Sequence, residues 1–162
     1  MGSQLVPSYY NWLWSCTCQR RYKVFFWLLL KDRLNTRNLL RRKNCPLDDY
    51  SCILCNLGTE ESTQHLFWTC LFAQQCWDIV CPLRSSLIST HQALFHLKDM
   101  INQSFFMEII VLTTWALWIT RNNRIFKHQI PSPMCQQGKF SCKNGAPIRN
   151  ARNLMLEDPV VS

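Results

Sequence analysis

The spacing of cysteine and histidine between residues 52 and 70 is the feature that most constrains how this chain can fold. Cys52 and Cys55 are separated by two residues, His65 follows after nine more, and Cys70 after a further four. A Cys-x2-Cys pair on a tight turn can direct both sulfurs to one point, and such a pair followed by a later Cys/His pair is typical of structural zinc sites. The spacing favours zinc over the two alternatives, which are buried or free cysteines and thiol redox chemistry.

A site of this kind would be closed. Three thiolates and one imidazole would give Zn²⁺ four protein ligands and leave no position for water, so the site would be structural and not catalytic. Its binding energy would stabilise a segment with little core of its own. A disulfide-exchange motif would place Cys-x-x-Cys beside a βαβ pattern, which this sequence lacks. We therefore expect one structural Zn²⁺ and no enzymatic activity.

The segment STQHLFWTC, which holds the second pair of candidate ligands, is predicted to begin a helix. Ser62 or Thr63 is a suitable N-cap, which would place His65 in the first turn. On an ideal α-helix, however, Cys70 would lie about 140° away from His65. Both side chains can reach one ion only if the helix ends or distorts between them.

The number of cysteines bears on whether the protein is secreted or intracellular. Ten cysteines in 162 residues would fit a secreted disulfide scaffold if a secretory signal were present, but MGSQLVPSYYNWLW lacks the basic and apolar regions of one. We predict an intracellular protein, nuclear or cytoplasmic, with reduced thiols. Cys76 recurs with Phe72 and Val80 every four residues, which predicts a packing role. The sequence assigns no role to Cys16, Cys18, Cys45, Cys81, Cys135 or Cys142.

The net charge of +8 is concentrated between residues 20 and 43, which hold nine basic residues and one acid. Apolar positions at helical spacing predict two short helices here, with Thr36 as the N-cap of the second. The segment fits the solvated face of an amphipathic helix pair, a contact with nucleic-acid phosphates, or a membrane surface. The candidate nucleic-acid-binding side chains are Arg20, Arg21, Lys23, Lys31, Arg33, Arg37, Arg41, Arg42 and Lys43.

A long aromatic helix is predicted from Phe105 to about Gln129, where apolar positions keep a helical period. Trp115 and Trp118 widen its apolar stripe and are expected to face the core or a partner rather than to stack on bases. The run FFMEIIVLTTWALWI contains Glu108 and is shorter than the roughly 20 apolar residues that span a bilayer. We expect a buried helix and no membrane partner.

Together these patterns predict a mainly α protein, a small helical zinc-binding domain with a CCHC knuckle, followed by the aromatic helix and an irregular tail. A content of 48% hydrophobic residues with only four glycines excludes a low-complexity chain. We divide the chain into an N-terminal lead (1–13), a zinc-binding domain (14–82), a helical extension (83–130) and a tail (131–162), which we expect to be disordered because prolines and glycines break every period.

The blocks YKVFFWLLLKDRLNTRNLLRR, CILC, EESTQHLFWTC, CW and WALWITRNNRIFK lie in this order between about Trp14 and Lys127. Together they resemble the zinc-binding domain of plant non-LTR (LINE-type) retrotransposon reverse transcriptases. In that family the domain follows the polymerase in a long polyprotein and often precedes a ribonuclease H domain. The resemblance implies an accessory role associated with RNA or DNA, and zinc at Cys52, Cys55, His65 and Cys70.

The enzymatic parts of such a polyprotein have no counterpart here. No stretch supplies the paired-aspartate polymerase motif, and the ten acidic residues are scattered rather than clustered as in ribonuclease H. We therefore expect a detached accessory domain. The alternative is a structural or protein-interaction domain that once docked the polymerase, or that self-associates through the aromatic helix, including the case of a non-functional remnant of the element.

Overall fold

The computed structural model describes residues 7–81 and 89–131. Within these ranges the chain forms helices and no strand beyond an isolated antiparallel bridge between Ser51 and Glu60. The prediction of a mainly α fold is confirmed, whereas the predicted tail, with Cys135 and Cys142, lies outside the described residues after Pro131. The helices are α1 (Ser8–Ser15), α2 (Arg20–Leu30), α3 (Arg37–Arg42), the π-helix η1 (His65–Thr69), α4 (Leu71–Val80), α5 (Thr90–Ile101) and α6 (Phe106–Lys127).

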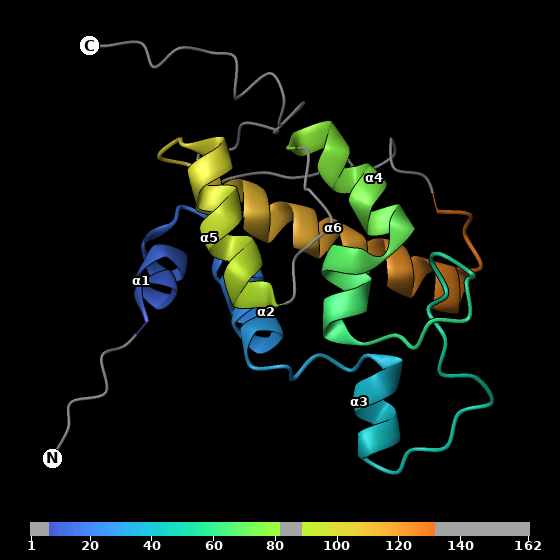
Figure 1. The fold of residues 1–162 in the computed structure, drawn as a ribbon. Helices are drawn as coiled ribbons and strands as arrows, with labels where there is room; N and C mark the ends of the chain where they lie inside the picture. Colours follow the sequence, from blue (N-terminus) through green and yellow to red (C-terminus); the bar gives the residue numbers. More distant parts are fainter. Residues whose placement is uncertain (1–6, 82–88, 132–162) are drawn as a thin grey trace, which may run out of the picture.

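The long helix α6 is the centre of the fold. It passes behind α4 and α5 in Figure 1, and it packs against α2, α4, α5 and η1. Most of its residues between Met107 and Leu117 are buried, because helices cover it on several sides. The predicted aromatic helix is therefore confirmed as a buried helix. None of the described helices has the length and apolarity that crossing a membrane requires.

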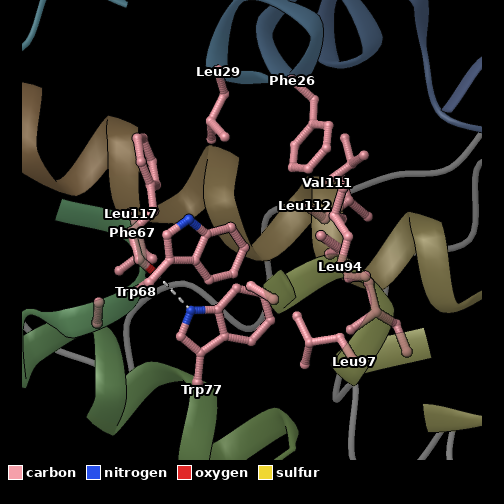
Figure 2. Close-up of a cluster of buried hydrophobic side chains, with 14 of the residues drawn as sticks. Phe26, Leu29, Phe67, Trp68, Trp77, Leu94, Leu97, Val111, Leu112 and Leu117 are labelled. Atoms are coloured by element: carbon pink, nitrogen blue, oxygen red, sulfur yellow. Dashed lines mark hydrogen bonds between the residues drawn. The ribbon is translucent and has the colours of Figure 1, made fainter. Parts of the chain in front are cut away.

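The core is one apolar cluster to which α1, α2, η1, α4, α5 and α6 contribute. Figure 2 shows part of this cluster. In it, the indole rings of Trp68 and Trp77 stack with centroids 5.4 Å apart. The indole nitrogen of Trp77 donates a hydrogen bond of 2.9 Å to the carbonyl of Phe67, so this buried donor is satisfied. The labelled members of the cluster are Phe26, Leu29, Phe67, Trp68, Trp77, Leu94, Leu97, Val111, Leu112 and Leu117.

The two tryptophans of the predicted aromatic stripe contact the protein's own core. Trp115 packs edge-on against Tyr22 and Phe25 of α2, with ring centroids 5.2 and 5.1 Å apart. Trp118 stacks on Phe67 of η1 at 6.4 Å. Of the two roles predicted for these side chains, the structure shows the packing role.

The basic segment forms the two predicted helices, α2 and α3. Thr36 caps α3 as expected, because its hydroxyl oxygen accepts a hydrogen bond of 3.3 Å from the amide of Leu39. In Figure 1, α3 lies apart from the main bundle, at the start of the loop that leads into the cysteine-rich turn. The position of α3 therefore depends on contacts with that loop.

Segments that we assigned to different regions share one core. Residues from Ser8 onward, within the predicted lead, form α1, and Leu13 is fully buried. The connection from α1 to α2 is tied to α6, because a carboxylate oxygen of Glu108 accepts hydrogen bonds from the amide (2.7 Å) and hydroxyl (3.0 Å) of Thr17. Helices α5 and α6 of the predicted extension likewise pack on the helices of residues 14–82.

Candidate metal centre

The first half of the site is a tight turn. The amide of Cys52 donates a hydrogen bond of 2.7 Å to the carbonyl of Thr59, which folds the chain back on itself. Asn56 and Gly58 have positive φ angles of 52° and 71°. Glycine adopts this left-handed conformation without steric cost, and asparagine tolerates it better than most residues. The sequence CNLG therefore supplies the backbone that a knuckle after Cys55 requires.

The second half of the site is η1. It provides the distortion between His65 and Cys70 that both side chains need to reach one ion. The hydroxyl of Ser62 accepts a hydrogen bond of 3.0 Å from the amide of His65, which confirms the predicted helix start. The amide of Cys70 then donates to the carbonyl of His65 at 2.8 Å, the i→i+5 bond of a π-helix. Residues five apart are thus brought to the same side. At Cys70 the backbone is extended (φ −61°, ψ 134°), so the helix ends there.

These two halves bring four ligand atoms to one point. The sulfurs of Cys52, Cys55 and Cys70 and a ring nitrogen of His65 all lie within 4.8 Å of one another. The two sulfurs of Cys52 and Cys70 are 3.9 Å apart, and the sulfur of Cys55 is 3.4 Å from Nε2 of His65. Tetrahedral zinc with Zn–S bonds of about 2.3 Å separates two sulfurs by about 3.8 Å. The cluster is therefore suited to one zinc ion.

The surroundings of the cluster fit a structural ion. Three of the four ligand residues are buried and Cys55 is half-buried, so the site is largely shielded from water. Nδ1 of His65 lies 3.3 Å from the hydroxyl oxygen of Thr69. If Nε2 held the metal, Nδ1 would carry the ring proton and would donate a hydrogen bond to the hydroxyl of Thr69, which would fix the orientation of the ring.

Comparison with known families bears on this site. Residues 2–77 match the family described as zinc-binding in reverse transcriptase. The matched segment holds all four ligands of the cluster, and the match supports a reverse-transcriptase zinc-binding domain in a reverse-transcriptase-related protein. Neither a curated protein nor a solved structure matches the chain. Helices α5 and α6 lie beyond the match, although α6 forms the centre of the core.

Within the candidate metal centre, two of the thiols share a proton. The hydrogen bond to Cys70, together with burial, raises the pKa of the Cys52 thiol to about 12. The same hydrogen bond lowers the pKa of Cys70. In the absence of metal, Cys52 is thus the protonated donor and Cys70 the group that more readily becomes the thiolate.

This pairing predicts that zinc uptake releases protons. Zinc binds the thiolate, so at pH 7 the metal must displace the proton of Cys52, whose pKa is raised to about 12. We expect at least one proton per zinc, and an affinity that falls about tenfold per pH unit for each displaced proton as the pH is lowered. Titration of metal-free protein with ZnCl₂ in weak buffer with a pH indicator measures the release.

Magnesium chloride is the matched control, because Mg²⁺ prefers oxygen ligands and should release no protons. Zinc binding without acidification would show that Cys52 is not a ligand.

The other described cysteines lie outside the cluster. Cys45 is exposed, and Cys16, Cys18 and Cys81 are buried. Cys76 packs against the core as predicted, and burial raises the pKa of its thiol to about 12, which makes it unreactive at neutral pH.

The predicted nucleic-acid-binding side chains divide into three groups. Lys23 is only 8% exposed, and its ammonium donates a hydrogen bond of 2.8 Å to the carbonyl of Trp14, because this side of α2 faces α1. Its ammonium is thus engaged inside the protein. Arg37 is half-buried and donates to the carbonyl of Ser51 at 2.8 Å. The exposed members are Arg20, Arg21, Lys31, Arg33, Arg41, Arg42 and Lys43.

A buried ion pair that the sequence did not reveal joins the domain to α6. The guanidinium of Arg121 donates to the carboxylate of Glu61 at 2.6 Å and 3.1 Å, and both side chains are almost fully buried. Glu61 also accepts from the amide of Arg37 at 3.0 Å, at the start of α3. One carboxylate thus holds α3, the strand-like turn after the knuckle, and the far end of α6 together. Its signal in the sequence was only an acid beside the knuckle and a base sixty residues later, and neither has a periodicity that would pair them.

Proposed function

We propose that this chain is a zinc-stabilised accessory module of a retrotransposon reverse transcriptase of the plant LINE type, and that it binds RNA or DNA through exposed basic side chains of residues 20–43. The module acts inside the cell, in the nucleus or cytoplasm. It has no catalysis of its own, because four protein ligands leave zinc no position for water or substrate. The match to residues 2–77 and the four-ligand cluster support the zinc-binding part of this proposal.

The observation that carries nucleic-acid binding is uncompensated positive charge on α2 and on the turn that follows it, whereas the arginines of α3 are paired with acidic side chains. The only acid between residues 20 and 43, Asp32, is already paired with Arg42 at 2.6 Å. Within the described part of the chain, the exposed side chains of Arg20 and Arg33 form no hydrogen bond or ion pair. Such cations are free to neutralise phosphates and release counterions.

Salt dependence tests this proposal. For single strands, the logarithm of the binding constant falls with the logarithm of salt concentration by about 0.7 per neutralised phosphate. We expect the zinc-loaded chain to bind labelled oligonucleotides with a steep slope. Arg20→Gln and Arg33→Gln should each make that slope shallower by about 0.7. Fluorescence anisotropy at several salt concentrations measures it.

Lys127→Gln is the matched control, because it removes one positive charge from an exposed position at the end of α6. It should leave the slope nearly unchanged. Affinity that does not depend on salt, or equal slopes for all three variants, would contradict binding through the basic segment.

The alternative, a module that docks a protein partner through the aromatic helix, finds less support. Trp115 and Trp118 were its expected contact residues, but Trp115 packs against α2 and Trp118 packs against η1. We therefore retain nucleic-acid binding as the proposed function.

A further inference from the structure

Helices α1 and α2 lie against each other in opposite directions. Near the end of α1, the carbonyl of Trp14 accepts a hydrogen bond from Lys23 in the first half of α2. Near the start of α1, the ring of Tyr10 lies 5.1 Å from the ammonium of Lys31, just after the end of α2. These two contacts fix how the side chains of the two helices are placed along their common edge.

Two exposed tryptophans border this edge. Residues four apart share a helix face, so Trp27 lies on α2 between Lys23 and Lys31, and therefore between the two contacts with α1. Trp14 follows Tyr10 by one turn on α1. The side chains of Trp14 and Trp27 are 49% and 36% exposed, the only tryptophans exposed to this degree among the described residues.

Positive charge accompanies these rings. Along α2 the outward positions recur at helical spacing as Arg20, Val24, Trp27 and Lys31, and all four are exposed. No aspartate or glutamate occurs before Asp32. We call the surface formed by Tyr10, Trp14, Arg20, Trp27 and Lys31 the α1–α2 face. It combines flat aromatic surface with cations and carries no compensating acid.

We propose that the α1–α2 face binds single-stranded nucleic acid, with unpaired bases stacked on Trp14 and Trp27 and the adjoining phosphates on Arg20 and Lys31. This inference rests on the proposed function and names the form of nucleic acid that the domain selects. Aromatic platforms beside a basic track bind single strands of many sequences, because every base has a face that can stack. Bases inside a duplex are already stacked on each other and are not available to the rings.

The test measures the affinity of the zinc-loaded full chain for a labelled single-stranded oligonucleotide and for a duplex of the same length. Both measurements are made at the same salt concentration. Trp27→Leu and Trp14→Leu should each weaken single-strand binding by about fivefold to a hundredfold, the usual loss when one stacking ring is removed. Their salt slopes should stay unchanged because no charge is lost. Trp27→Phe should restore part of the affinity.

Phe126→Leu is the matched control, since Phe126 is an aromatic side chain, 74% exposed, at the other end of the fold. It should bind as the unaltered chain does. Zinc content and the helical circular-dichroism signal verify that each variant is folded.

The outcomes separate this inference from the proposed function. Salt-dependent binding that is unaffected by Trp27→Leu and Trp14→Leu, or equally strong on duplex, would overturn the stacking face and leave the proposed function standing. Absence of salt-dependent binding would overturn both. Binding to anionic phospholipid vesicles, or self-association, that is lost in the tryptophan variants while oligonucleotide binding is unchanged would assign the face to another partner and overturn the inference.

Discussion

Cys70→Ser is expected to remove stoichiometric zinc from the chain and to unfold the knuckle. Cys70 supplies a buried sulfur 3.9 Å from that of Cys52, and its backbone ends η1. Losing a residue that only orients a zinc ligand already weakens binding by about 10- to 100-fold, so losing a ligand should cost more than about 100-fold. Elemental analysis after chelator challenge should find one zinc per unaltered chain and much less in the variant, together with a lower helical signal.

Cys45→Ser provides the matched control, because Cys45 is an exposed cysteine that lies before the knuckle and outside the cluster. It should retain one zinc per chain. Full metal content in Cys70→Ser after the same challenge would mean that another residue is the fourth ligand.

Arg121→Met is expected to destabilise the zinc-loaded protein by about 3–5 kcal/mol, the usual cost of leaving one member of a buried ion pair without its partner. The carboxylate of Glu61 is completely buried. Of the hydrogen-bond donors that the structure shows for it, only the amide of Arg37 would remain. The free energy of unfolding in urea, followed by circular dichroism, measures the effect. Replacing both partners, in Glu61→Gln with Arg121→Met, should recover part of the loss, because no unpaired charge is then buried.

Arg41→Met is the control for this experiment, since it breaks an exposed ion pair with Glu60 at 3.5 Å. Water screens that pair, so the expected cost is at most about 1 kcal/mol. If Arg121→Met cost no more than Arg41→Met, the buried pair would contribute nothing particular to the position of α6.

Prediction from sequence succeeded where the signal is local. The cap at Ser62 before η1 and the cap of α3 at Thr36 were both identifiable, because a hydroxyl two or three residues before an amide is a short-range pattern. The requirement for a distortion between His65 and Cys70 was also evident from helix geometry. Its solution as a π-helix was not, since that depends on the packing of Phe67 and Trp68 into the core.

Prediction was less successful for charged side chains that interact across the fold. Lys23 lies in the same basic stretch of sequence as Arg20 and Arg21, yet its side chain is buried while theirs are exposed. The reason is the position of α1, which covers one side of α2 and supplies the carbonyl of Trp14. Helical periodicity indicates which residues share a face, but it does not show which neighbouring helix will cover that face.

The sequence alone determined the ligand set, the helical class and the concentration of positive charge, because each depends on residue types at short spacing. Only the tertiary structure decided the rest. It showed that Trp115 and Trp118 face inward, that Glu61 pairs with Arg121, and that the exposed tryptophans are Trp14 and Trp27. These features depend on contacts between residues far apart in the chain, and the free energy of such contacts is set by which surfaces the folded helices bury together.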